Sequence, residues 1–475
     1  MGVFDIFFSR IKAAVGYQQT FEDKVVAGDI GSALGMMELN EAQVNKAIKE
    51  YQVEQHEIMK RMDKPIFDSK TGKFKGWVKR WKLPLSYATY INEIALVFLY
   101  GRQVQWLERS EDTSNAYMAY TDFLKERHFH SKWRQAKRLA GSETRSALLF
   151  HCFQNKEGKA DCLIKVLAKS LGDDIYVIKD QFDRVVHFAR GYNLSEAGGK
   201  SRYHVDIYMD DVIYHCVRAN MGWKITQERN YIGKKPFILF EQETEWHGSQ
   251  PLIDRQEYIK SRTADVNDYM ADPALVATAD VVKGMPDKDS ENKLYVLSEK
   301  GKLEYLVPDT ANELKKMETD DNERHIFRET FTPNIDWETM TKLSNVSAKA
   351  LQQMMVLADV KAKLRKETHD EYLTRAGNLI RAIIGNVLDV SLKTECDNLK
   401  LEFEYQEPFG EDITEAITNA VKLYNSDAMS QETLVELNPL IRDKEREKKR
   451  IATEQEIKEQ KELEQQQRSI FEPTE

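Results

Sequence analysis

Residues 251–273 read PLIDRQEYIKSRTADVNDYMADP, a stretch that predicts one helix of about six turns. Pro251 suits a first helical turn, and Asp272-Pro273 ends the helix. Its apolar residues are too few for a continuous core-facing stripe, so we expect a helix that is wet on most of its circumference. A ring of identical subunits would shield such a helix through small contact patches and leave one face toward a channel.

A small β-unit and a second polar helix follow along the chain. Residues 274–309 contain short strand-like runs, two of them joined as a predicted hairpin at 298–301. Thr310 and Glu313 form a capping box for a helix that runs to about Phe331 and has few apolar residues. At about 1.5 Å per residue, helices of roughly 20 residues span about 30 Å, enough for the wall of a short tube.

The flanking regions have ordinary core-forming patterns. Residues up to about 150 are mostly helical in pattern, and 150–245 read as strands of an antiparallel meander. After 347, two successive helices and one strand near 399–405 are predicted, and a charged helix follows from Asp443. Two basic runs with interleaved aromatic residues, a loop-like one at 60–82 and one at 125–138, could contact phosphate backbones or simply solvate a face.

Composition excludes several classes of protein. The 475 residues carry a formal net charge of −9, which argues against a protein that coats nucleic acid with a basic surface. The four cysteines are widely spaced, as expected in a reducing compartment without a disulfide framework. The N-terminus lacks the pattern of a signal peptide, no run is long enough to predict a membrane span, and Ile6 disfavours myristoylation of Gly2.

The sequence contains no motif that predicts catalysis. A P-loop, a dinucleotide-binding glycine motif, a nucleophile elbow and a zinc-protease motif are all missing. His151, Cys152, Cys162, His215 and Cys216 have side chains that suit zinc, but they lack the usual ligand spacing and are interpreted as residues of neighbouring strands. We predict no catalytic residue, cofactor or metal. A metal-dependent nucleic-acid-processing enzyme and a cytoplasmic scaffold or adaptor stay open as alternatives.

Several stretches in a fixed order resemble portal proteins of tailed double-stranded DNA bacteriophages, of the siphophage type. Besides the opening stretch they are INEIALVFLYG at 91–101, YIGKKPFILFEQ at 231–242, LSNVSAKALQQMMVLADVKAKLRKE at 343–367 and MSQETLVELNPLIRDKEREKKRIATE at 429–454. The resemblance covers nearly the whole chain. One departure is Ser347-Ala348, where the family often has Ser-Gly, and it can shift the predicted loop boundary by a residue or two.

The resemblance implies an α+β portal fold that is mainly helical, with an antiparallel β meander in the wing and a small β clip. The implied parts are a wing at 1–250 (α-rich to about 150, then the meander), stem helix 1 at 251–272, the clip at 273–309, stem helix 2 at 310–331, a tunnel loop at 332–346, long wing helices with a returning strand at 347–407, and a crown with the charged C-terminal helix at 408–475.

It also implies a non-enzymatic ring of about twelve subunits at one capsid vertex. Double-stranded DNA would pass through it during packaging and ejection, and its partners would be the terminase large subunit, a head–tail adaptor, and the major capsid and scaffolding proteins. It would be found in the virion, and in the host cytoplasm during assembly, without a membrane. Candidate residues are Thr339, Met340, Thr341 and Lys342 in the tunnel loop, Lys260 and Arg262 in the stem, and Lys288, Glu299, Lys300 and Lys302 on the clip.

Overall fold

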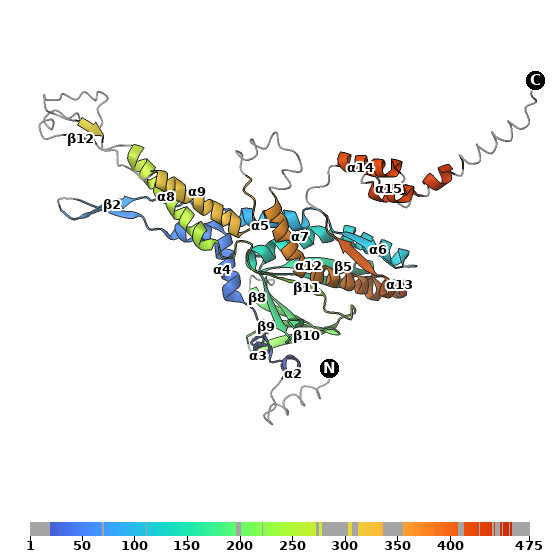
Figure 1. The fold of residues 1–475 in the computed structure, drawn as a ribbon. Helices are drawn as coiled ribbons and strands as arrows, with labels where there is room; N and C mark the ends of the chain where they lie inside the picture. Colours follow the sequence, from blue (N-terminus) through green and yellow to red (C-terminus); the bar gives the residue numbers. More distant parts are fainter. Residues whose placement is uncertain are drawn as a thin grey trace, which may run out of the picture. The chain divides into compact units, whose positions relative to one another are not determined.

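The computed structural model describes most of the chain. It covers residues 20–68, 71–110, 112–195, 201–220, 222–271, 275–277, 303–305, 312–335, 355–406, 413–426, 428–438, 441, 447–448, 450–455 and 457. The chain divides into two compact units, one of Met1–Thr341 with Met354–Gln406 and one of Lys342–Gln353 with Glu407–Glu475. Helices and antiparallel sheets occur together in the first unit, so the predicted mixture of helix and antiparallel sheet is confirmed (Figure 1).

The N-terminal part of the first unit is largely helical. Its helices are α2 (Phe21–Ala27), α3 (Ile30–Leu34), α4 (Glu41–Tyr51), α5 (Tyr87–Tyr100), α6 (Ser114–Glu126) and α7 (Phe129–Glu143), with short 3-10 turns at Val53–Gln55 and Glu57–Lys60. The basic run 60–82 was predicted as a loop, and this was wrong. It contains the antiparallel strands β1 (Lys64–Phe67) and β2 (Phe74–Val78), because its aromatic and branched residues favour strands on either side of a turn.

Two antiparallel sheets follow. The five-stranded sheet has the order β10-β9-β8-β7-β6, which is the predicted meander. Its strands are β6 (Asp173–Lys179), β7 (Val185–Ser195), β8 (Ser201–Tyr208), β9 (Val212–Ala219) and β10 (Gly222–Arg229). The last predicted strand of that meander, β11 (Phe237–Glu241), instead joins β4 (Arg145–Gln154) and β5 (Ala160–Leu167) in a separate sheet of order β11-β4-β5. Its run of buried apolar residues requires cover on both faces.

Helices cover one face of the three-stranded sheet, and the five-stranded sheet covers the other. On one face, Leu148, Phe150, Ile238 and Phe240 belong to the largest hydrophobic cluster, together with residues of α7 and α12 (Val356–Ile383). On the other face, the Phe237 ring stacks on Phe188 of the five-stranded sheet with 3.9 Å between ring centroids. The three-stranded sheet is therefore the middle layer between helices and the larger sheet.

Helix α12 runs without a break through the region where two helices were predicted. It continues into a π-helical turn, Ile384–Leu388, followed by a 3-10 turn at Val390–Leu392 and by α13 (Lys393–Asn398). Its predicted apolar stripe is confirmed, since Ala376, Leu379, Ile380 and Ile383 all lie in the core. The strand predicted near 399–405 is β14 (Leu401–Glu404), which pairs with β3 (Gln105–Glu108).

The second unit contains the helices α14 (Ile413–Asn425) and α15 (Gln431–Leu437). Ser430 caps α15 by accepting a hydrogen bond from the Thr433 N–H. Lys448 pairs with Glu432 and Glu436 at 2.8 Å each. The charged C-terminal helix predicted from Asp443 lies in part outside the described residues. No helix within the described ranges has the length and apolar composition that a membrane crossing requires.

Candidate functional site

Two polar helices, α8 (Gln250–Ala271) and α9 (Asn312–Glu329), lie side by side (Figure 1). The Arg255 guanidinium is 2.7 Å from the Glu318 carboxylate, and Gln256 Nε2 donates to the Thr319 carbonyl at 3.1 Å. Between the helices, β12 (Leu275–Ala277) pairs antiparallel with β13 (Leu303–Tyr305). The chain therefore leaves along α8 and returns along α9, as the opening stretch and its successor predicted.

Helix α8 has three polar side chains that are fully buried. Gln256, Glu257 and Ser261 are each 0% exposed, whereas the other described polar residues of the helix are exposed or half-buried. For Glu257 and Ser261 the physical reason is that an extended segment before α5 supplies hydrogen bonds to these side chains, whereas Gln256 bonds to α9. The Leu85 N–H donates to Glu257 Oε1 at 2.8 Å, and the Leu83 N–H donates to Ser261 Oγ at 3.0 Å.

Glu257 and Ser261 belong to a polar stripe that continues toward the end of α8. Asp265 accepts a hydrogen bond from the Trp81 N–H at 2.8 Å and pairs with the Arg61 guanidinium at 2.6 Å. Asp268 accepts one from the Trp81 indole N–H at 2.5 Å. Because Glu257, Ser261, Asp265 and Asp268 are spaced by four, four and three residues, they lie on one helix face. This spacing is visible in the sequence and could have indicated a polar stripe with its own partner.

His56 forms a buried ion pair with Glu257 of this stripe. Its Nδ1 is 2.6 Å from Glu257 Oε1, its Nε2 is 2.9 Å from the Glu50 carbonyl, and both side chains of the ion pair are at most 1% exposed. Burial disfavours the charged imidazolium, but the hydrogen bond and charge of Glu257 outweigh it and raise the pKa of His56 above its ordinary value. The pair therefore favours the charged histidine.

A second buried cluster lies at the C-terminal end of α9. The Glu245 carboxylate lies 2.5 Å from Lys137 Nζ on α7, and 3.0 Å and 3.4 Å from Lys361 and Arg365 on α12. Burial alone would raise the pKa of Glu245, but these three cations hold it well below its ordinary value. Lys361 also donates to the Thr330 carbonyl at 3.0 Å, just beyond α9.

This cluster was not predicted from the sequence. The available signal was weak but real: Lys137 stands next to Ala136 and Lys361 next to Ala362, within helix faces that are otherwise apolar and buried. A cation in such a position predicts a buried anion nearby, because a buried charge needs a partner.

The two predicted stem residues lie on different sides of α8. Lys260 is half-buried and Arg262 is exposed. At about 100° per residue, two positions place their side chains about 200° apart, so they do not share a face. The Arg262 guanidinium lies 5.8 Å from the centre of the Tyr258 ring. The predicted tunnel-loop residues Thr339, Met340, Thr341 and Lys342, and the predicted clip residues Lys288, Glu299, Lys300 and Lys302, lie outside the described residues.

The histidines and cysteines considered for zinc do not converge. Cys152 and Cys162 are register partners on β4 and β5, while His215 pairs with Asp206 at 2.7 Å and with Glu228 at 3.2 Å. Within the described part of the chain, no three His, Cys, Asp or Glu side chains are grouped so that they could hold a metal ion. His151, Cys152 and Cys162 lie on the neighbouring strands β4 and β5, as interpreted, whereas His215 and Cys216 lie on β9 of the five-stranded sheet.

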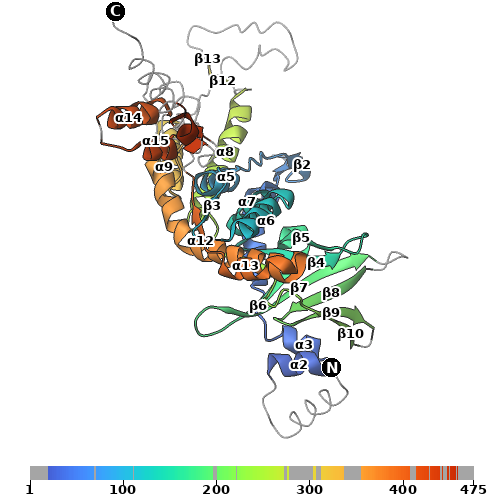
Figure 2. The same cartoon turned by 90° about the vertical axis from the view of Figure 1, so that its right-hand side faces the viewer.

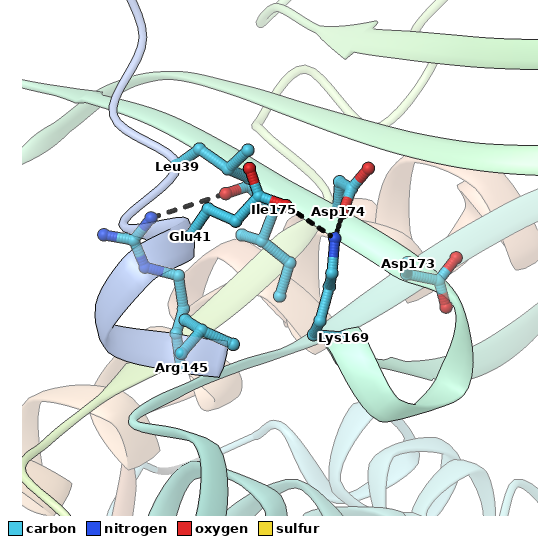
Figure 3. A pocket seen from close by; sticks show the side chains of 8 residues that line it. Leu39, Glu41, Arg145, Lys169, Asp173, Asp174 and Ile175 are labelled. Atoms are coloured by element: carbon cyan, nitrogen blue, oxygen red, sulfur yellow. Dashed lines mark hydrogen bonds and ion pairs between the residues drawn. The ribbon is translucent and has the colours of Figure 1, made fainter. Parts of the chain in front are cut away.

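A small cavity between α4, β4 and β6 is equally unsuited to a ligand (Figure 3). Its volume is about 20 Å³, enough for one water molecule. The charged groups in its wall already have partners: Lys169 lies 2.6 Å from Asp174 and 3.5 Å from Glu41, and Arg145 donates to the Ile175 carbonyl at 3.4 Å. We therefore take the α8–α9 pair, and not this cavity, as the candidate functional site.

Comparison with known proteins adds a family match over most of the chain. The family model described as "Phage portal protein, SPP1 Gp6-like" matches residues 37–461. No curated protein matches the sequence. One similar solved structure is the neck of a native GTA particle computed with C12 symmetry, at 8% identity and a TM-score of 0.37, covering 80% of this chain and 96% of that chain.

Two further structures have comparable similarity. The virion of a native gene transfer agent particle is 8% identical with a TM-score of 0.35, and covers 74% of this chain and 88% of that chain. The neck of an empty GTA particle computed with C6 symmetry is 9% identical with a TM-score of 0.38, and covers 75% and 88%. At these values the structural likeness is too low to support an argument.

Proposed function

This chain belongs to the SPP1 Gp6-like family of phage portal proteins, and from that membership we propose how its parts are used. It is a structural protein of the virion that stands at a capsid vertex. We infer that about twelve copies form a closed ring through head-to-tail contacts. The alternatives of an adaptor or a metal-dependent enzyme are not supported by any group of residues described above.

The observation that carries the proposal is the α8–α9 pair. Two long polar helices run out from the main unit, are joined beyond their ends by the β12–β13 pairing, and are held at the base by the Glu245 cluster. In a ring, such pairs would stand side by side as the stem around a channel. The proposed parts are the wing at 1–250, the stem at 251–272 and 310–331, the clip at 273–309, the tunnel loop at 332–346, the returning wing segment at 347–407 and the crown at 408–475.

The proposed channel would pass double-stranded DNA without holding it tightly. A dense Lys and Arg lining would bind phosphates through counterion release and oppose sliding. Lys260 or Arg262 would make a transient phosphate contact, and residues 339–342 would form the tip of the tunnel loop. Because Lys260 and Arg262 lie on different faces of α8, we expect one of them, and not both, to border the channel.

The clip would be the docking surface for other proteins. Lys288, Glu299, Lys300 and Lys302 are the residues we propose for contact with the terminase large subunit during packaging and with a head–tail adaptor afterwards. Capsid and scaffolding proteins would surround the ring at the vertex, and assembly would take place in the host cytoplasm. The portal itself would hydrolyse nothing, which is consistent with a sequence without a P-loop.

Electron microscopy tests the proposal directly. Purified protein is imaged in negative stain at low and moderate salt, with class averages along the particle axis. We expect rings with a central hole and about twelvefold symmetry. Particles without a hole at every salt and protein concentration, also after addition of the capsid scaffold, would contradict the ring.

A further inference from the structure

The hairpin β1–β2 is an exposed apolar surface outside the helix pair. Nearly all residues of its two strands are exposed, including Phe67 at 57%, Phe74 at 53% and Trp77 at 62%. The three rings contact one another in a row, with centroid distances of 6.1 Å and 5.4 Å. A two-stranded hairpin is at best marginally stable in water, and grouped exposed aromatic side chains mark interaction surfaces.

The base of this hairpin is held firmly. Asp265 of α8 binds both legs of the hairpin, Arg61 before β1 and the Trp81 N–H after β2. The Arg61 guanidinium also donates to the Trp81 carbonyl at 2.9 Å, and the Arg80 N–H donates to Asp63 at 3.1 Å. From this clamp the hairpin extends toward the same side as α8 and α9 and diverges from them (Figure 1). A fixed base presents the aromatic residues in a defined direction.

The hairpin and α9 lie on opposite sides of α8 (Figure 2). Glu257, Ser261 and Asp265 face the segment that carries the hairpin, whereas Arg255 and Gln256 contact α9. At about 100° per residue, the centres of these two groups are about 190° apart around the helix. The hairpin and the outward face of α9 therefore lie on opposite flanks of the same unit.

The outward face of α9 complements the hairpin. It exposes two apolar side chains, Leu314 at 67% and Met317 at 70%. The exposed charged residues between 313 and 324 are three acids, Glu313, Asp320 and Asp321, and two bases, Lys316 and Arg324. The hairpin segment 60–82 carries nine Lys or Arg residues and two Asp, a net charge of +7. Aromatic residues can thus cover the apolar pair while lysines approach the acids.

We propose that the hairpin of one copy packs on the outward face of α9 in the next copy of this chain. The contact is head-to-tail: each copy offers a hairpin on one flank and an α9 face on the other, so the contact repeats around a closed ring. The inference rests on the proposed function, because it names the surface by which neighbouring portal subunits join. It assigns the basic aromatic run 60–82 to subunit contact and not to DNA.

The first test removes the apolar side of the contact. A variant with Phe67→Ser, Phe74→Ser and Trp77→Ser should need on the order of thirtyfold more protein for half-maximal ring assembly, because buried aromatic residues at an interface dominate its affinity. Its circular dichroism and thermal unfolding should match those of the wild type, since the three side chains are exposed in the single chain. Phe182→Ser, at a position 66% exposed elsewhere, is the matched control and should assemble normally.

The second test reverses the charges. Lys64→Glu with Lys75→Glu should weaken assembly, and so should Glu313→Lys with Asp320→Lys. All four changes in one chain should restore it, because each interface then regains opposite charges. Rescue by the combined variant identifies the two surfaces as partners, and failure of the rescue with both pairs individually defective overturns the pairing.

The third test separates this contact from ring formation. Chains with Trp77→Cys and Met317→Cys should form intermolecular disulfides under mild oxidation, whereas Phe182→Cys with Met317→Cys should not. Crosslinks without rings would support the contact and contradict the proposed portal ring. Rings from the aromatic and charge variants at wild-type concentrations would overturn the contact and leave the ring intact. Normal assembly with lost retention of double-stranded DNA in a gel-shift assay would instead make the hairpin a nucleic-acid contact.

Discussion

Helices α8 and α9 have similar polar sequences but use their polar residues differently. In α8, Gln256, Glu257 and Ser261 are fully buried, and each makes a hydrogen bond to another part of the chain. Among the described side chains of α9, Ile326 and Phe327 alone are buried, and its other polar and apolar groups are exposed or half-exposed. The comparison teaches that the polar side chains of a helix can bond to other parts of the chain or remain exposed to solvent, and that composition does not distinguish the two cases.

The largest expected effect concerns the base that both helices share. Glu245→Gln should lower the free energy of unfolding by about 3–5 kcal/mol, because Lys137 and Lys361 then remain buried without their anion. Chemical denaturation followed by circular dichroism measures it. Glu243→Gln, a change at a side chain 65% exposed, is the matched control and should cost less than about 0.5 kcal/mol. Equal losses for the two variants would show that the cluster does not fix the base.

The next effect contrasts the two ends of α9. Ile326 is 0% exposed and packs with Ile91, Trp246 and Ile253. Ile326→Ala should therefore cost about 2–5 kcal/mol, from lost burial and the cavity that remains. Met317→Ala, at the exposed end, should change the stability of the single chain by less than about 0.5 kcal/mol. A comparable loss for Met317→Ala would mean that the outward face of α9 is already covered within one chain.

A smaller, pH-dependent effect is specific to α8. Since the pKa of His56 is raised in the folded chain, the stabilisation from its charged form is fully present below the ordinary histidine pKa of about 6.5. It is lost as the pH rises through the folded-state pKa. The stability difference between wild type and His56→Gln should therefore shrink from pH 6 to alkaline pH, as measured by denaturation at several pH values. In a Glu257→Gln background this change should disappear, and its persistence there would assign it to another group.

The smallest effect on stability is expected at the predicted channel residues. Lys260→Gln and Arg262→Gln should each change the free energy of unfolding by less than about 0.5 kcal/mol, because neither makes an ion pair among the described residues. Their effects on DNA should differ. Loss of one phosphate contact reduces the slope of log K for DNA binding against log salt concentration by about one in magnitude. We expect this reduction for one of the two variants. An equal reduction in both would contradict their placement on different faces of α8.

Much of the secondary structure could be predicted because its causes are local. The two prolines that bracket 251–273 set the limits of α8, which runs Gln250–Ala271. The core-forming pattern of α12 and the strand β14 were predicted for the same reason. The hairpin within 60–82 was missed because its many lysines obscured a strand pattern of aromatic residues. The assignment of β11 to the smaller sheet was missed because strand order depends on distant partners.

The sequence by itself determined where the polar helices begin and end and the family to which the chain belongs. The tertiary structure alone decided which polar groups are buried and which remain available to a partner. The physical reason is distance along the chain: His56 and Glu257 are 201 positions apart, and Lys137 and Glu245 are 108 apart. A charge is stabilised in the interior by a partner that only folding brings close, and no local pattern specifies that partner.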